Sequence, residues 1–473
     1  MATITDCTRL APRAARKLAV ALVTSAMLVG CASLDAQQDR QRASSLIHER
    51  SGFSPDWEAQ WNEVHREWDG RSPLTAETAV RLALVSNRSI RASVERLAAS
   101  RAEFVQAGLL PNPILSVGLG FSVGDSSGAT SISAGLTQQL VALWLRGDRM
   151  KEAAAELEGE VLSLSDATLR IIAEVRHMHT ELLWMQRELA LLGEHQSLIE
   201  KHVRIIGQQV DAGIASSLDF TRIELALHAL INERMQQEHA FRVARLAMLE
   251  KLGLAEFTAD FSLDESGTSE THSLALQGED TVVEHALANR LDLAAASARV
   301  IAARQSLRLE ERSRFPANLE AGAAYSRDEN RRQELGPAVS LEVPLFDSGD
   351  ARAARAAALW RASEIEADAV RQRAIFESRS AWSEWTRAHA LLARHDHDVL
   401  PRANRQLELA QTLLDAGEVD MTVLLEAQRE AIAASRVRNR LQADVIRSAI
   451  TLDYATSTFV GSSPTAQNPN DTE

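Results

Sequence analysis

The amino-acid sequence predicts a mostly α fold with a small β part, in which one structural unit occurs twice along the chain. The composition is the first observation. Aromatic residues make up only 4% and there are 11 prolines among 473 residues, as is typical of long helices that pack through small side chains. The second observation is a set of motifs that recurs in order. The third is a set of short segments in which apolar and small residues alternate, which predicts strands.

Four motifs of the first half recur in the second half in the same order, each 202 to 204 positions later. A nearly constant offset across separate motifs indicates a duplication of the whole unit. The matched segments are 83–90 with 286–293, Pro113 with Pro316, 143–148 with 345–350, and 211–213 with 415–417.

Each half is expected to contain a helix, two strands, a very long helix, a glycine turn and a shorter helix. In the first half we place these elements near 75–109, 114–123, 130–140, 148–210 and 217–253. In the second half they fall near 280–313, 317–326, 337–345, 350–414 and 420–458. The predicted organisation is a signal peptide at 1–30, an N-terminal extension at 31–73, repeats at 74–255 and 280–460, a linker at 256–279 and a disordered tail at 461–473.

The N-terminus is expected to be an export signal. A basic segment at 9–17 precedes an apolar run at 18–29, which is shorter than the ~20 residues of a membrane-spanning helix. The run ends in Leu-Val-Gly-Cys, which resembles the bacterial lipobox, so Cys31 is the predicted site of lipidation, including palmitate. Ala32 follows instead of the Asp that retains lipoproteins in the inner membrane, which implies the outer membrane. An ordinary signal peptide with a chance cysteine is the alternative.

The strands alternate with period two. In 115–123 every second residue is apolar and every residue between is Ser or Gly, and similar patterns occur at 132–137 and 339–343. A soluble sandwich could show this alternation, but each segment has about the ~9–11 residues of a transmembrane strand. Such strands must close into a barrel. Because four strands are too few, we expect three copies to share a 12-stranded barrel.

The lengths of the predicted helices indicate the shape of the rest of the molecule. At ~1.5 Å per residue, the predicted helix at 148–210 is roughly 95 Å long, and the two shorter helices stacked end to end reach a similar length. Apolar residues near the glycine turns have heptad spacing, which favours coiled-coil pairs. These charged helices are no bilayer spans, so they should project as a tunnel into an aqueous compartment.

Several further motifs carry a family resemblance. They are Ala-Leu-x-x-Asn at 83–87, Ala-Leu-x-x-Arg-x-Asp-Leu at 286–293, the segments 107–113 and 343–349, the two Asp-Ala-Gly turns and Val-Leu-Pro at 399–401. From about residue 74 onward the sequence resembles the outer membrane efflux protein (TolC) family. The resemblance implies a trimeric channel with a 12-stranded outer-membrane barrel and a helical periplasmic tunnel, the exit duct of a tripartite efflux pump. Its implied partners are a periplasmic adaptor, an inner-membrane pump and outer-membrane lipid.

The resemblance also implies functional positions at the end of the tunnel. Gly213, Ser216 and Gly417 correspond to the tip that contacts the adaptor, and a purely structural turn is the alternative for both glycines. Asp219 and Glu426 match the acids that narrow the aperture, although a solvated surface acid is the alternative for Glu426. Val423 replaces the acid expected there. The segment 140–144 departs from the family pattern without an interpretation.

Other function classes are disfavoured. The formal net charge is −14, which makes nucleic-acid binding improbable, since that binding depends on basic residues. Cys7 lies in the predicted signal, so no intrachain disulfide is expected in the mature chain. No motif for catalysis, a cofactor or a metal is present. The segment 107–113 looks like channels of heavy-metal pumps, but the histidines at 177 and 179, and at 395 and 397, are two residues apart and cannot share an ion on a helix. Type I protein secretion and a scaffold lipoprotein without a pore are the alternative functions.

Overall fold

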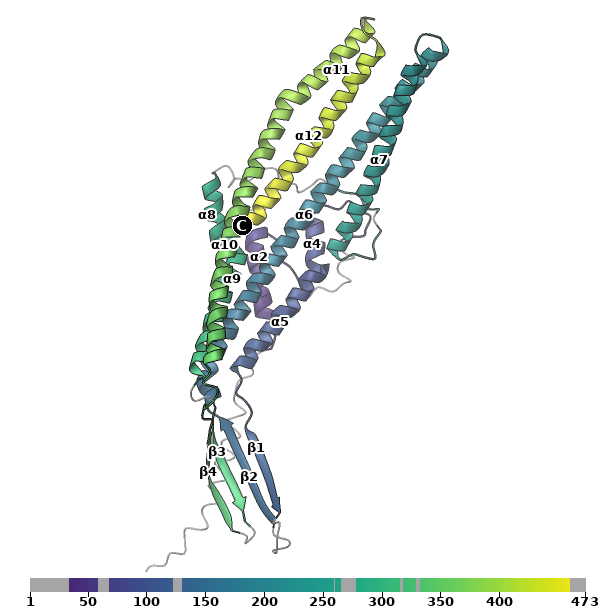
Figure 1. Ribbon diagram of the computed structural model, residues 1–473. Coiled ribbons are helices and arrows are strands. Elements are labelled where there is room, and N and C mark those ends of the chain that lie inside the picture. The colour runs from purple at the N-terminus through teal and green to yellow at the C-terminus, as the bar shows by residue number, and fades with distance from the viewer. Residues whose placement is uncertain are drawn as a thin grey trace, which may run out of the picture.

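A computed structural model describes residues 34–57, 68–121, 130–258, 260–264, 278–314, 318–328 and 332–459. The molecule is a long rod, with a small sheet at one end and two helical hairpins at the other (Figure 1). The mostly α fold with a small β part is therefore confirmed. Cys31, the predicted signal peptide, most of the predicted linker and the predicted C-terminal tail lie outside the described residues.

The sheet consists of four antiparallel strands in the order β1-β2-β3-β4. They are β1 (Ile114–Phe121), β2 (Thr130–Gln139), β3 (Leu319–Arg327) and β4 (Gln333–Leu341). Two strands come from each repeat, as predicted. Every residue of β1 is exposed, and its apolar residues alternate with Ser and Gly. The isolated chain therefore leaves this surface without protein cover.

The fourth strand lies four residues earlier than the predicted 337–345. Leu341 pairs with Leu319, the first residue of β3, and beyond it only the N–H of Glu342 still donates across, to the carbonyl of Asn318 at 3.0 Å. Pro344 also lacks the N–H that a ladder requires. Pro337 lies inside β4 opposite Ala323, where it leaves the strand one N–H donor short.

The helix predicted at 75–109 is two helices, α4 (Ala76–Ser86) and α5 (Arg88–Gly108). Between them Asn87 is extended at φ −62° and ψ 122°, and its side-chain oxygen accepts hydrogen bonds from the backbone N–H of Ser89 and Ile90. This N-cap starts a new helix, because an Asn side chain satisfies N–H groups that have no partner at a helix start. The second repeat breaks in the same place, at Arg290, between α8 (Glu279–Asn289) and α9 (Leu291–Arg312).

The long helix of the first repeat, α6 (Val141–Asp211), has 71 residues and begins seven positions before the predicted start. The segment 140–144, which the family pattern left unexplained, forms its first turn. Helices α5 and α7 (Ser217–Leu252) lie end to end along α6 (Figure 1). Where α7 ends it meets the break between α4 and α5, since the Asn87 amide donates to the carbonyl of Lys251 at 2.7 Å.

The long helix of the second repeat is interrupted. It comprises α10 (Asp350–Arg394), a π-helical segment η2 (His395–Val399) and α11 (Leu400–Asp415), and α12 (Met421–Thr456) returns beside them. The cause of the interruption is Pro401, which lacks an N–H and whose ring crowds the carbonyl four residues earlier. A π turn relieves such crowding, because it inserts one residue into the helix without breaking it.

The main core lies near the middle of the rod. It brings together Ile47, Val80, Ile172, Met248 and Leu291, one from each of five helices and all at most 2% exposed. The first of these belongs to α2 (Gln37–Ser51), a helix of the N-terminal extension that the sequence patterns did not predict. Towards the hairpin ends the buried clusters are small and rich in alanine. Within the described residues, no helix has an apolar stretch long enough to cross a membrane.

Candidate functional site at the tip of the helical hairpins

Two turns form the free ends of the hairpins α6–α7 and α11–α12 (Figure 1). Gly213 and Gly417 have φ values of +71° and +73°, a conformation that glycine adopts without strain. In each turn the glycine N–H donates to the carbonyl three residues earlier, at 2.9 Å from Val210 and 3.0 Å from Leu414. The next N–H donates to the carbonyl five residues earlier in both turns. This is the Schellman arrangement, so the predicted glycine turns are confirmed as structure.

The residues after each turn start the returning helix. The hydroxyl oxygen of Ser216 accepts a hydrogen bond from the N–H of Leu218 at 3.0 Å and caps α7. Asp420 has the same role at α12, where its carboxylate accepts from the N–H of Thr422 and Val423. The two turns have the same construction, as the duplication predicts. The cap at Asp420 was not predicted, although an Asp just before an apolar run is a helix-start signal.

The tip exposes apolar side chains. Ile214, on the turn between α6 and α7, is 77% exposed, and Leu218, in the first turn of α7, is 57% exposed. An added Cβ on either turn glycine would meet no atom within 4 Å. The turns are therefore open surfaces that are held by their own backbone hydrogen bonds rather than by packing.

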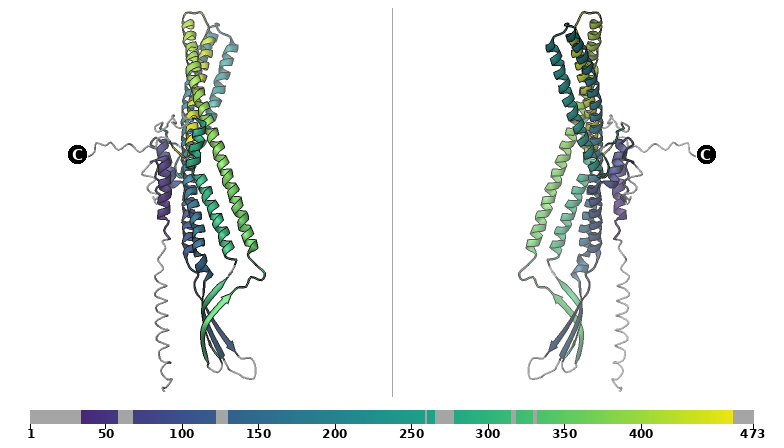
Figure 2. Two further views of the ribbon diagram at one scale, coloured as in Figure 1. Left: turned by 90° about the vertical axis from the view of Figure 1, so that its left-hand side faces the viewer. Right: turned by 90° about the vertical axis from the view of Figure 1, so that its right-hand side faces the viewer.

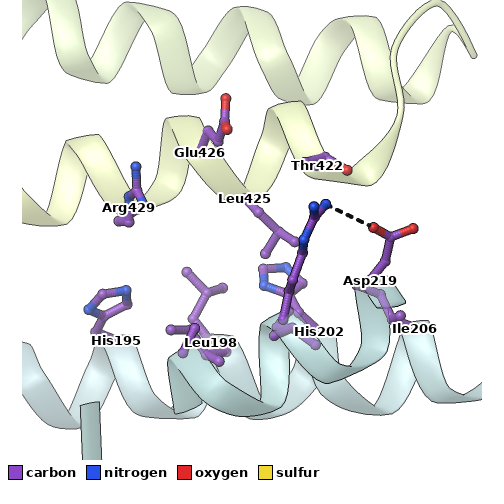
Figure 3. Close-up of a pocket in the computed structure, with 13 residues that line it drawn as sticks. His195, Leu198, His202, Ile206, Asp219, Thr422, Leu425, Glu426 and Arg429 are labelled. Carbon is purple, nitrogen blue, oxygen red and sulfur yellow. Dashed lines mark ion pairs between the residues drawn. The ribbon is translucent and has the colours of Figure 1, made fainter. Parts of the chain in front are cut away.

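The two predicted aperture acids line one groove between the hairpins (Figure 3). Asp219 comes from α7 and Glu426 from α12, and the groove has a volume of about 220 Å³. The Asp219 carboxylate forms an ion pair with Arg222 at 3.5 Å, and both side chains are more than half exposed. In Figure 3 the Glu426 carboxylate points away from Asp219. The structure thus brings the two acids to one groove without joining them.

Four basic or titratable residues of this groove were not predicted. Arg222 and Arg429 come from α7 and α12, and His195 and His202 lie seven residues apart on one face of α6. Burial lowers the pKa of both histidines, and nearby cationic residues lower it further. They are therefore neutral near pH 7. No sequence motif identifies these four residues, because isolated His and Arg residues are common on helices.

A second unpredicted contact ties the hairpins together about ten residues below the acids. The Arg436 guanidinium of α12 donates to Glu188 of α6 and to Glu233 of α7, each at 2.5 Å. Three positions on, the Asn439 amide donates to the carbonyl of Trp184 at 3.2 Å. Because one guanidinium bonds both legs of the neighbouring hairpin, this is where α12 is fixed to α6 and α7.

The histidine pairs contact different parts of the protein. His177 Nε2 lies 3.2 Å from the hydroxyl of Thr451, and His179 Nε2 lies 2.8 Å from the carbonyl of Leu74. His395 Nε2 lies 2.9 Å from the carbonyl of Ala434. Within the described part of the chain, no group of three or more His, Cys, Asp or Glu residues is placed to hold a metal ion.

The chain is similar to three characterised bacterial proteins. It is 23% identical over 452 residues to the pyoverdine export outer membrane protein OpmQ of Pseudomonas aeruginosa, which covers 88% of this chain and 91% of OpmQ. It is 25% identical over 377 residues to the cobalt-zinc-cadmium resistance protein CzcC of Cupriavidus metallidurans, and this match covers 78% of this chain and 86% of CzcC. It is 23% identical over 300 residues to nodulation protein T of Rhizobium leguminosarum, where the match spans 60% of this chain and 61% of the relative.

The model of the outer membrane efflux protein family matches residues 282–458, which is most of the second repeat. Over these residues the chain matches the outer membrane efflux protein family. The first repeat carries the same elements in the same order, so the family fold accounts for both halves. The resemblance drawn from the turn and strand motifs is confirmed.

Solved structures show the same efflux-protein fold. A membrane protein from Pseudomonas aeruginosa matches with a TM-score of 0.69 and 18% identity over 86% of this chain and 97% of that one. The outer-membrane channel OprN matches with a TM-score of 0.68 and 20% identity, over 88% of this chain and 95% of OprN. At these identities the likeness establishes the fold of the chain.

Proposed function

We propose that this chain is the outer-membrane exit channel of a tripartite efflux pump and conducts solutes passively. The observation that carries the proposal is the pairing of two features in one rod. An exposed four-stranded sheet with alternating apolar residues lies at one end, and two glycine-turned hairpins lie at the other (Figure 2). The relatives named for pyoverdine export and for metal resistance support the same role.

The sheet argues for an oligomer. Its outer strands, β1 and β4, each have one neighbour within the sheet. An open edge in hydrocarbon would leave N–H and C=O groups without hydrogen bonds, so these edges must pair with other chains. Three copies would contribute twelve strands, within the range of outer-membrane barrels, whereas four strands cannot close. A homotrimer is therefore part of the proposal.

The orientation follows from the chemistry of the two ends. The sheet would lie in the outer membrane, and the hairpins would extend through the periplasm towards an adaptor and an inner-membrane pump. The turns at Gly213 and Gly417, with Ser216, would present the open tip to the adaptor. Lipid on Cys31 would add a second attachment to the outer membrane.

The groove acids would act on the conducted ions. Threefold repetition would place three copies of Asp219 and of Glu426 around one axis, and rings of carboxylates favour cations in pores. The histidines of the groove are neutral near pH 7, whereas Arg429 and Arg222, which pairs with Asp219, carry charges opposite to those of the acids. Nothing in this arrangement requires a catalytic group.

Conductance in planar bilayers tests this proposal. Purified protein should give ion-conducting steps with a preference for cations. The variant Asp219→Asn with Glu426→Gln should lower the cation-to-anion permeability ratio. Glu366→Gln, which changes an exposed acid on α10 far from the tip, is the control and should leave the ratio unchanged. Protein that inserts into the bilayer without any conductance would contradict the channel proposal.

A further inference from the structure

Two histidine rings lie between the helical hairpins, at the groove near the tip. His195 and His202 are seven residues apart on α6, so they share one face of that helix, and both rings point towards α12 (Figure 3). His202 is only 4% exposed. In each ring Nδ1 is buried and has no hydrogen-bond partner among the described residues. Buried polar atoms without partners are rare, which singles out these two rings.

The contact between the hairpins at this groove is apolar. Ile206 of α6 and Ile223 of α7 are buried, and Leu425 of α12 points towards α6 in Figure 3. The Asp219–Arg222 ion pair lies within α7. In the described part of the chain, no residue that lines the groove forms a hydrogen bond or an ion pair from one hairpin to the other. The groove with the hairpins in contact is called closed below.

Charged groups face the two histidines from all three helices. They are Lys201 on α6, Asp219, Arg222 and Glu233 on α7, and Glu426, Arg429 and Arg436 on α12. Two of the acids are paired with arginines, Asp219 at 3.5 Å and Glu233 at 2.5 Å. The third, Glu426, points away from both rings in Figure 3. The carboxylates are therefore poorly placed to stabilise an added positive charge on the rings.

A proton on either ring destabilises the closed groove. An imidazolium donates from both nitrogens, so the buried Nδ1–H would lack an acceptor. Burial, and then the nearby cationic side chains, lower the pKa of both histidines while the groove is closed. Water in an open groove would restore the ordinary pKa of about 6.5. The open groove therefore binds protons more tightly, and its share rises as the pH falls below about 6.5.

The contact at Arg436 limits the part of the hairpins that can separate. Its guanidinium donates to Glu188 of α6 and to Glu233 of α7, which fixes α12 to both helices at that level. Met421, the first residue of α12, lies 15 positions earlier, about 22 Å along the helix. This length of α12 carries its side of the groove and leads to the turn at Gly417. The helix can therefore leave α6 at the tip while the contact at Arg436 holds.

We propose that His195 and His202 form an acid-sensitive switch, which separates the α11–α12 hairpin from the α6–α7 hairpin at the tip when the rings are protonated. At neutral pH the groove closes over two neutral rings, and acid opens it from the Arg436 contact towards the turns. Protonation of buried histidines between about pH 5 and pH 6 separates packed surfaces in other pH sensors. The inference rests on the proposed function, because the tips form the entrance of the proposed channel.

Spin labels on the two turns test the switch. Ala212→Cys and Ala416→Cys place one label on an exposed residue of each turn. Dilution with unlabelled chains confines the measured distance to one copy, and wild type carried through the same labelling gives the background. From about pH 7.5 to about pH 5, pulsed electron paramagnetic resonance should show a severalfold rise in the population with the longer distance. Adding His195→Gln and His202→Gln should abolish this rise.

His228→Gln is the matched control. His228 is exposed on α7, two positions after Ala226, which lines the groove, and it does not line the groove itself. This variant should keep the rise. Arg429→Gln is a second test that leaves both rings in place. Because it removes a cation that lowers the pKa of His195, the rise should begin at a higher pH.

The outcomes separate the switch from the channel. A distance that does not change between about pH 7.5 and about pH 5, in protein that conducts ions in planar bilayers, would overturn the switch alone. A rise that persists without the two histidines would overturn it as well, because other groups would then cause the opening. Protein that inserts into bilayers without conductance would contradict the proposed function, whatever the spin labels show.

Discussion

The turn glycines allow a sharp test of the adaptor tip, because a third glycine with the same backbone conformation lies in the core. Gly417 has φ +73° and open space where a Cβ would stand. Replacing it with valine therefore adds backbone strain of about 1–3 kcal/mol and no steric clash. This energy is small against the packing of the long helices, so Gly417→Val should fold and reach the membrane while its tip is distorted.

Gly253 provides the contrast. Its φ is +76°, but an added Cβ would lie 3.0 Å from the carbonyl carbon of Ser86 and would overlap the carbonyl oxygen. The neighbouring residues Leu252 and Leu254 are fully buried. Gly253→Val therefore combines the same backbone strain with a collision against rigid backbone, and it should lower the amount of folded protein severalfold.

The assay measures outer-membrane abundance by immunoblot beside chemical cross-linking to the adaptor. Gly417→Val and Gly213→Val should retain near-normal abundance and lose most of the cross-linked product. Gly253→Val should lose abundance, with cross-linking reduced only in proportion. Normal cross-linking in both tip variants would refute the assignment of the turns as the adaptor contact. Parallel loss of abundance in the tip variants would show that the turns have a structural role only.

Three further outcomes are expected. Cys31→Ser should abolish palmitate labelling and processing before that residue, and unchanged labelling would refute the lipoprotein assignment. Gly322→Ala should prevent assembly of the trimer, because its Cβ would overlap the Leu136 carbonyl in the neighbouring strand, whereas Gly336→Ala, where the space is open, should assemble normally by gel electrophoresis. Burial and the nearby Arg447 lower the pKa of His177 to about 4 in the folded protein. As the pH falls below about 6.5, this histidine is protonated in the unfolded chain before it is protonated in the folded chain. The free energy of unfolding should therefore fall as the pH is lowered from about 6.5 to about 4. In chemical denaturation, the free energy of unfolding of His177→Gln should fall less than that of the wild type over the same pH range.

Much of the fold could be predicted because its signals are periodic or repeated. Alternation located three of the strands within a few residues, and the duplicated Asp-Ala-Gly motif located both turns. The break at Asn87 was missed although Asn is a common N-cap, because the apolar pattern continues across it. The shift of β4 depends on where its partner strand begins, which is a tertiary property. A local sequence pattern therefore cannot predict the position of β4.

The site was predicted less completely than the fold. Gly213, Gly417, Asp219 and Glu426 were found through family motifs, and their shared groove appeared only in the structure. The Arg436 contact joins residues about 200 and 250 positions apart, and nothing in its sequence surroundings distinguishes it from other arginines on α12. Contacts between distant helices of this kind become visible only when the helices are placed side by side.

The mass of the assembled protein tests the account most directly, because the channel requires a barrel shared between chains. Native mass spectrometry of detergent-extracted protein should give a complex of about three times the mature chain mass, from four strands per chain and a minimum of about eight strands for closure. A stable monomer that retains the sheet would contradict the shared barrel, and with it the proposal that this chain forms a pore.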